Sequence, residues 1–358
     1  MLSCLYEDPQ YLAALLRRSE PKEVDLMVDI ITQRLYSNHY KARDEFLMLS
    51  LLSHVLSEDL AGTSDPTDVL AGVGPATKLL SAYTRRGPNT EALKSALYKP
   101  MSLVLARKNL ELEIEPTRVY ATVLEELRFK SDSELKADIT PQEAWALPEV
   151  RAIIIPRVKN LLDIVELFLT RIVSVRGLLP YGIRVIARKI YETTQDRFQK
   201  ASHGEQMRGV ANFLFVSYFC PAIIQPEAFE LCSTSNRPSS HMKRNLVRIA
   251  SALKMVGSLT PFDDGSEPWH AELSSLVHNS QELMLQFYSS LCDVLELEEH
   301  RRVTVYMEST ESLTPTRTFE LNSIYLLHAA LYRNYTEVGG LGLGLGLGLG
   351  LELRRHAS

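Results

Sequence analysis

The feature that most constrains the fold is a helical repeat of apolar residues that dominates the chain. In the segment 157–172, apolar side chains return every three or four residues and charged residues fill the remaining positions. This spacing places one apolar stripe on a single face of an α-helix, which must pack against other helices. The stripe consists of Val158, Leu161, Leu162, Val165, Phe168, Leu169 and Ile172.

Stripes of the same kind occur in further segments, which are separated by clusters of proline, glycine and serine. They lie at 24–35, 42–60, 91–105, 119–127, 184–198, 244–255 and 273–295. The sequence contains no reliable run of alternating apolar and polar residues bounded by hairpin turns, so we predict an all-α protein. Thr140-Pro141-Gln142-Glu143 predicts one helix start, because it combines an N-cap residue, a proline at the first helical position and the Glu of a capping box.

Composition narrows the classes of function. The 358 residues are 45% hydrophobic and 23% charged, with a formal net charge of -5, which is typical of a chain that buries a large core. Because no long run of Lys or Arg occurs, we expect neither nucleic acid nor an anionic membrane as a partner. The sequence has no basic leader and no run of 18 apolar residues. We therefore predict a cytoplasmic protein without an integral membrane segment, and leave recruitment to the cell cortex open.

The residues that usually carry catalysis or bind metals form no recognisable pattern. Four cysteines lie too far apart for a zinc site and are too few for a disulfide scaffold, so we interpret them as buried free thiols. They are Cys4, Cys220, Cys232 and Cys292. The segment AGVGPATKLL at 71–80 departs from a phosphate-binding loop at Thr77 and at Leu79. We expect no metal and no cofactor.

The end of the chain differs from the rest in composition. From Gly339 onward the sequence reads GGLGLGLGLGLGLELRRHAS. Glycine costs backbone entropy in any regular element, and no polar face balances the leucines, so we interpret residues 336–358 as a disordered low-complexity tail. Weak membrane association or self-association is the functional alternative for this tail. By length, the remaining residues 1–335 fit one large domain or two moderate ones.

Three motifs resemble a known family of helical domains. They are LPYGIRVIARKI at 179–190, ANFLFVSYFCPAIIQPEAF at 211–229 and KRNLVRIASAL at 243–253. Together they resemble the GTPase-activating (RasGAP) domain of Ras regulators, and most closely the GAP-related domain of the IQGAP-type scaffolds. The resemblance spans roughly residues 5–335. It implies one helical domain at 1–335, with a central part at about 40–260 and flanking helices from both ends. It implies a multi-helix bundle that binds a small GTPase of the Ras superfamily, from the Ras or Rho family, in its GTP-bound form.

The middle motif contains an apolar run that reaches Cys220-Pro221-Ala222 and then continues. Proline lacks an amide N–H and clashes with the preceding helical turn, so we expect the helix to stop or kink near Phe219. The resemblance implies that this break aims the flanking side chains at the docking surface of the GTPase. A proline that only ends a core helix is the alternative.

The resemblance also implies an arginine finger, a guanidinium that stabilises transition-state charge and accelerates GTP hydrolysis by roughly 10³ to 10⁵. The family pattern Phe-Arg-Gly-Asn-x-x-Ala-x-Lys falls on residues 70–78, which puts Ala71 at the finger position. The Phe-Leu-Arg motif, whose Arg steadies the finger loop, falls on residues 215–217, which puts Ser217 at the supporting position. The sequence therefore predicts that both catalytic arginines are absent.

Two nearby arginines are the obvious substitutes for a finger. Arg85 and Arg86 follow a predicted helix of about eight residues, which places them roughly 10 to 12 Å from the finger loop. At that distance we expect them not to reach the GTPase. We interpret the pair as a basic helix C-terminus that complements the helix dipole.

We expect a docking groove for the GTPase, lined by Lys78, Arg184, Phe213, Leu214, Pro221, Ala222, Arg244 and Arg248. Surface Arg and Lys residues in such a groove steer an acidic partner. Phe213 and Leu214 fit the core equally well, and Arg184 fits an internal strut. IQGAP scaffolds lack the finger and bind Rho-family GTPases without activating them, so the resemblance favours a binding module that is not an enzyme. An active GTPase activator and a helical scaffold with no GTPase partner are the alternatives.

Overall fold

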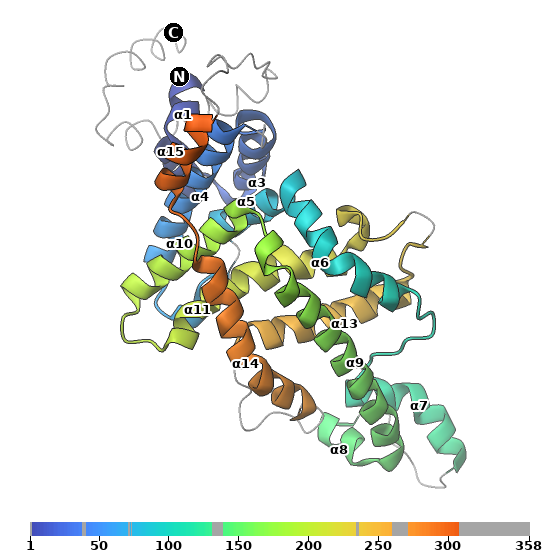
Figure 1. Ribbon diagram of the computed structural model, residues 1–358. Helices are drawn as coiled ribbons and strands as arrows, with labels where there is room; N and C mark the ends of the chain where they lie inside the picture. The colour runs from blue at the N-terminus through green and yellow to red at the C-terminus, as the bar shows by residue number, and fades with distance from the viewer. Residues whose placement is uncertain are drawn as a thin grey trace. The chain divides into compact units, whose positions relative to one another are not determined.

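The computed structural model describes residues 2–37, 41–70, 72, 74–130, 139–233, 236–259 and 271–307. Within these ranges the chain forms helices and connecting segments and no β-strand, which confirms the predicted all-α bundle (Figure 1). The Gly/Leu tail and its predicted boundary at 335/336 lie outside the described residues.

The chain divides into two compact units, each built from separate stretches of sequence. Unit 1 comprises Met1–Gly87, Pro180–Ser202 and Cys292–Ser358, and unit 2 comprises Pro88–Leu179 and His203–Leu291. Almost all of the first family motif thus belongs to unit 1, whereas the second and third motifs belong to unit 2.

Unit 1 is organised around one long central helix, α4. Its elements are α1 (Leu2–Glu7), α2 (Pro9–Arg18), α3 (Pro21–Ile30), the π-helical segment η1 (Ile31–Leu35), α4 (Ala42–Ala61), the 3-10 turn η2 (Pro66–Asp68), α5 (Pro75–Thr84), α10 (Tyr181–Arg197) and α15 (Leu297–Met307). Helices α2, α5, α10 and α15 all pack against α4. The stripes predicted at 24–35, 42–60 and 184–198 are confirmed as α3 with η1, α4 and α10.

A partly buried polar network joins several helices of unit 1. The Glu45 carboxylate on α4 accepts hydrogen bonds from the Tyr83 hydroxyl at 2.5 Å and from the Arg86 guanidinium at 3.0 Å. Arg86 also donates to the Tyr36 carbonyl at 2.6 Å. Helix α10 reaches this network at Gly182, where a Cβ atom would lie only 1.7 Å from the Tyr83 hydroxyl oxygen. The close approach of α10 to α5 and α4 therefore requires glycine at this position.

Unit 2 contains the remaining helices. The stripes predicted at 91–105, 119–127, 157–172 and 244–255 are confirmed as helical, and the stripe predicted at 273–295 is helical as far as Cys292. The elements are α6 (Gly87–Leu105), α7 (Pro116–Lys130), α8 (Pro141–Ala146), α9 (Pro148–Ser174), η3 (Arg176–Leu178), α11 (His203–Asn212), η4 (Phe213–Phe219), α12 (Cys220–Ile224), η5 (Pro226–Phe229), α13 (Ser240–Gly257) and α14 (Ala271–Cys292). The predicted capping box starts α8: the Thr140 amide donates to the Glu143 carboxylate at 2.7 Å, and the Glu143 amide donates to the Thr140 hydroxyl at 3.2 Å.

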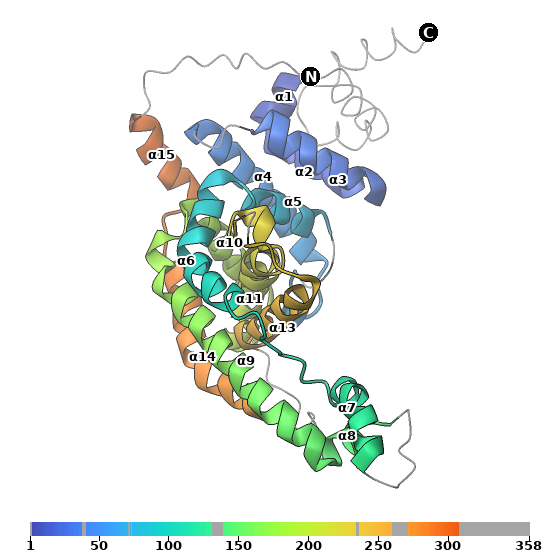
Figure 2. The same ribbon diagram turned by 90° about the vertical axis from the view of Figure 1, so that its right-hand side faces the viewer.

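Part of unit 2 has a small hydrophobic core of its own. Helices α7 and α8 lie beside the N-terminal half of α9 (Figure 2). Their shared core consists of Val119, Tyr120, Ala144, Val150, Ile154 and Val158. Helix α9 thus contributes Val150, Ile154 and Val158 to this core, and it also packs against α13.

Of the stop or kink predicted near Phe219, the stop does not occur: the helix type changes at this residue and the helix continues. Helix α11 passes into the π-helical segment η4, which ends at Phe219, and the chain continues as α12 to Ile224. Pro221 lies in the first turn of α12, where a missing N–H is tolerated. The wider π turn thus changes the hydrogen-bond pattern just before the proline. The helix ends where the Gln225 amide donates to the Pro221 carbonyl at 3.0 Å.

This composite helix is notably long and apolar. Residues His203–Ile224 are long and apolar enough to cross a membrane by length and composition alone. However, 78% of its most apolar window is buried inside the structure, which is typical of a core helix.

The thiols are free at all three cysteines whose side chains are described, as predicted. Cys220 is buried, but Cys232 and Cys292 are partly exposed, so the prediction of burial is wrong for these two. The Cys220 thiol donates to the Ala250 carbonyl, and burial raises its pKa to about 12. The Cys4 side chain lies outside the described residues.

Candidate functional site

The loop between α4 and α5 carries the predicted finger position, and both of its ends are anchored. Ala71 itself lies outside the described residues. Before it, Leu70 is buried and adopts a left-handed backbone with φ 57. After it, the Asp59 carboxylate accepts a hydrogen bond from the Ala76 amide at 3.1 Å, and burial raises the pKa of Asp59. The Gly74 amide donates to the Thr77 hydroxyl at 2.8 Å. Thr77 thus stabilises the start of α5.

The two arginines considered as substitutes for the finger lie at the opposite end of α5. Arg85 is the C-cap residue of this ten-residue helix, which places it about 15 Å along the axis from the first turn. The Arg86 side chain is 7% exposed and pairs with Glu45 inside the polar network of unit 1. Arg86 is therefore part of the core as well as a basic residue near a helix end.

A third guanidinium group, that of Arg197, does contact the α4–α5 loop. Arg197, at the end of α10, donates through Nε to the Thr63 carbonyl at 2.7 Å. Thr63 follows α4 and begins the α4–α5 loop. No motif in the sequence indicated this contact, because the two residues are 134 positions apart.

Lys78, a predicted groove residue of unit 1, is engaged within its own unit. Its ammonium group pairs with the Asp25 carboxylate at 2.8 Å and lies 3.5 Å from the Pro21 carbonyl oxygen. These contacts link α5 to α3. Lys78 thus contributes to the packing of unit 1.

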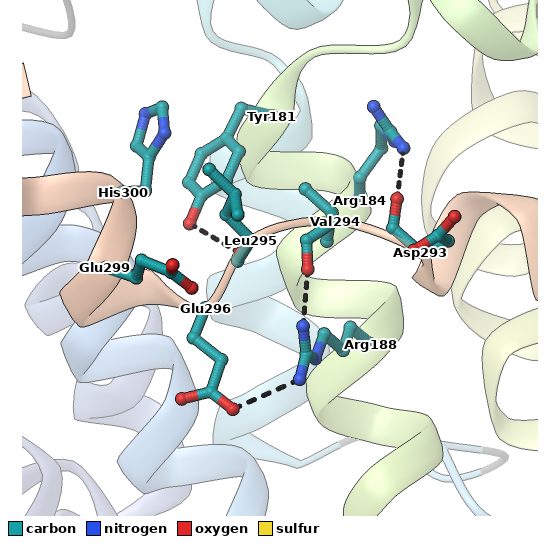
Figure 3. A pocket seen from close by; sticks show the side chains of 9 residues that line it. All are labelled: Tyr181, Arg184, Arg188, Asp293, Val294, Leu295, Glu296, Glu299 and His300. Atoms are coloured by element: carbon teal, nitrogen blue, oxygen red, sulfur yellow. Dashed lines mark hydrogen bonds and ion pairs between the residues drawn. The ribbon is translucent and has the colours of Figure 1, made fainter. Parts of the chain in front are cut away.

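Arg184, the other predicted groove residue of unit 1, acts as a strut. Its guanidinium donates to the Asp293 carbonyl at 2.7 Å, in the connector that precedes α15 (Figure 3). One turn later on α10, Arg188 donates to the Val294 carbonyl and pairs with the Glu296 carboxylate at 3.1 Å. Both guanidinium groups therefore hold the connector 293–296 against α10.

The same region of unit 1 contains a cavity of about 610 Å³. The Tyr181 ring stacks on the His300 ring with centroids 3.6 Å apart, and the Tyr181 hydroxyl donates to the Leu295 carbonyl at 3.1 Å (Figure 3). Burial raises the pKa of Tyr181 to about 12, so its hydroxyl stays a neutral donor. Within the described residues, no group of three or more His, Cys, Asp or Glu side chains is placed to hold a metal ion.

The predicted groove residues on η4 and α12 are mostly interior. Phe213, Leu214 and Ala222 are fully buried, and Pro221 is half-buried. Ser217, at the supporting position for a finger loop, is also buried. Segments η4 and α12 both pack against α13. Phe213 and Leu214 are therefore core residues, which was the alternative to a role in the groove, because their side chains do not face solvent.

Helix α13 presents the strongest candidate surface of unit 2. Its sequence, SHMKRNLVRIASALKMVG, contains four Lys or Arg residues and no Asp or Glu. The Ser239 hydroxyl caps its start by accepting from the Met242 amide at 3.2 Å. One side of the helix, here called the α13 face, is open to solvent to different degrees. It consists of Arg244, Val247, Arg248, Ser251 and Lys254.

A short segment, here called the strap (residues 110–113), runs along the other side of α13. The buried Asn245 amide donates to the Leu110 carbonyl at 2.6 Å and accepts from the Leu112 amide at 3.3 Å. Arg248 pairs with the Glu113 carboxylate, at a position where both side chains are less than one-fifth exposed. The strap therefore engages one of the two α13 arginines predicted for the docking groove.

Comparison with known proteins identifies the family of this fold. The RasGAP profile, described as GTPase-activator protein for Ras-like GTPase, matches residues 51–258, which is more than half of the chain. The chain belongs to the RasGAP family. The matched range of this RasGAP protein runs from α4 to α13 and includes the finger position, η4 and the strap.

Individual relatives agree with this assignment and extend it to the IQGAP type. The RasGAP chain is 27% identical over 332 residues to Ras GTPase-activating-like protein rgaA of Dictyostelium discoideum, covering 92% of this chain and 40% of that protein. It is 28% identical over 334 residues to gapA of the same organism, covering 92% and 38%. For human IQGAP2 the identity is 26% over 334 residues, covering 91% and 21%. The chain thus spans two-fifths or less of the length of these curated relatives.

Proposed function

We propose that this RasGAP-family chain binds a Ras-superfamily small GTPase, of the Ras or Rho family, in its GTP-bound form and in the cytoplasm. We further propose that it does so without supplying an arginine finger. The observation that carries the proposal is the cationic face of α13, which lies inside the range matched by the RasGAP profile. The names of the relatives, Ras GTPase-activating-like proteins, support the same class of partner.

The α13 face has the chemistry that an acidic protein surface requires. Arg244 and Lys254 are exposed, and no carboxylate on the helix opposes them. Val247 lies between them in sequence and is 46% exposed, so it offers apolar area that a partner can bury. Cations around an apolar contact favour fast, electrostatically steered association with a negatively charged partner.

The absence of a finger is supported by the residues at the family's catalytic positions. Ala71 and Ser217 occupy the places of the two arginines, and neither side chain carries charge. Arg86 is paired inside unit 1 and would have to leave Glu45 behind to act elsewhere. The Glu45 side chain is 27% exposed, and leaving a largely buried carboxylate without its partner is costly, which opposes such a movement.

A binding panel with purified GTPases tests this proposal. Ras and Rho GTPases are loaded with a non-hydrolysable GTP analogue or with GDP, and association is measured by biolayer interferometry. We expect binding of the GTP-analogue form, and a loss of about tenfold or more in affinity for Arg244→Glu, which reverses a charge on the α13 face. Lys159→Glu on exposed α9 surface is the matched control and should bind normally. Equal losses for both variants, or no nucleotide-dependent binding, would refute the proposal.

A working GTPase activator is the second candidate function, and the contact of Arg197 with the α4–α5 loop favours it. This guanidinium lies at the loop where the family places its finger, although it donates to a backbone carbonyl. Single-turnover GTP hydrolysis separates the two functions. Acceleration by roughly 10³ that disappears in Arg197→Ala would establish the activator, and an unchanged intrinsic rate supports the binding module.

A further inference from the structure

Arg248 lies at the boundary between the α13 face and the strap. An α-helix turns by roughly 100° per residue, so Arg248 projects between the directions of Arg244, on the open side, and Asn245, on the strap side. Arg244 is exposed and Asn245 is almost fully buried beneath the strap. Small rotations of the Arg248 side chain therefore decide whether its guanidinium group contacts the strap or points to the open face.

The strap holds the Glu113 carboxylate against Arg248 by several independent contacts. Asn245 binds the backbone on both sides of Glu111, at Leu110 and Leu112. The Arg157 guanidinium donates to the Glu113 carbonyl at 3.1 Å. With its backbone fixed in this way, Glu113 loses little conformational freedom when it pairs, which favours the internal ion pair.

We propose that Glu113 is an internal competitor for Arg248 and that it sets the affinity of the α13 face for its acidic partner. The inference rests on the proposed function, because it concerns the same surface. A partner carboxylate that approaches the α13 face must share the Arg248 guanidinium with Glu113 or displace it. Releasing Arg248 from Glu113 adds a planar, bidentate donor to the face and strengthens binding.

Charge-neutral and charge-conserving variants of Glu113 test the competition. Glu113→Gln removes the carboxylate charge at constant shape, and Glu113→Asp keeps the charge but shortens the side chain by one methylene. We expect both to raise the affinity for the GTP-analogue form of the GTPase by about two- to fivefold at low salt, which is the range for a partly exposed ion pair. The gain should shrink at high ionic strength.

Glu111→Gln is the matched control, because it makes the same change in charge on the same strap. Glu111 pairs with His241 at 2.8 Å, whereas Arg248 pairs with Glu113, so substituting Glu111 leaves the Arg248 pair in place. We expect a smaller gain than for Glu113→Gln. Glu113 also pairs at 3.5 Å with Arg118, whose side chain is 70% exposed. In an Arg248→Ala background, the difference between the two variants should therefore shrink to the small contribution of this exposed pair.

The outcomes distinguish this inference from the proposed function. If the unmodified chain binds no GTPase, the proposed function fails and the competition fails with it. If the chain binds but Glu113→Gln and Glu113→Asp leave the affinity unchanged, or Glu111→Gln gives an equal gain, only the competition is overturned. Thermal unfolding of each variant checks its fold, and the conservative Glu113→Asp variant decides the question should Glu113→Gln unfold.

Discussion

The tight contact between α10 and the polar network of unit 1 makes Gly182→Ala the sharpest test of the fold. An added Cβ would lie 1.7 Å from the Tyr83 hydroxyl oxygen, 2.9 Å from its Cζ and 3.0 Å from a Glu45 carboxylate oxygen. The Tyr83 side chain is 1% exposed and is held by Glu45, so it has no free space to move into. The helix α10 or the Tyr83 ring must therefore shift.

The expected cost follows from the interactions that this shift disrupts. Overpacking of a filled core costs about 1–3 kcal/mol, and loss of a hydrogen bond to a charged group costs about 1.5–3 kcal/mol. Replacing glycine by alanine inside a helix returns up to about 1 kcal/mol. We therefore expect Gly182→Ala to lower the free energy of unfolding by about 1.5–6 kcal/mol.

Urea denaturation followed by circular dichroism measures this change. Gly204→Ala on α11 is the matched control, because a Cβ there meets nothing within 4 Å, and we expect it to be neutral or slightly stabilising. Tyr83→Phe removes the clashing oxygen, so the double variant Gly182→Ala with Tyr83→Phe should lose less than the sum of the two single losses. An unfolding free energy of Gly182→Ala within about 0.5 kcal/mol of the unmodified chain would refute the packing argument.

Three further predictions concern other parts of the fold. Asn245→Ala should lower the free energy of unfolding by about 2–4 kcal/mol, because it leaves the buried Leu110 carbonyl without its donor, and faster amide hydrogen exchange at 110–113 would locate the effect. Burial raises the pKa of Asp59 above the ordinary value of 3.8, so its contribution to stability is present below pH 3.8 and is lost as pH rises through the folded-state pKa; Asp59→Asn should remove this pH dependence in acid titrations of unfolding. Iodoacetamide should modify the partly exposed Cys232 before the buried Cys220, whose pKa is about 12, and equal rates in the folded chain would contradict the burial of Cys220.

The helices and their starts could be predicted from the sequence, because they depend on neighbours a few residues away. The apolar stripe on α9 and the capping box at Thr140 involve spacings of three and four residues, and both are confirmed. The end of the middle helix could not be predicted in this way. Local rules place a break before Pro221, whereas tertiary packing supports a π turn that carries the helix on to Ile224.

Side-chain roles at the candidate site depended on residues that are distant in sequence. The residue type at the finger position could be predicted from the motif alone, because the motif alignment is enough to show that residue 71 is not an arginine. Whether a given arginine is available to a partner is a different question. Arg184 is held by a carbonyl 109 positions away and Arg248 by a carboxylate 135 positions away. The sequence by itself determined which charges α13 carries, and the tertiary structure decided which of them are already paired, because pairing depends on distances in space that no local pattern encodes.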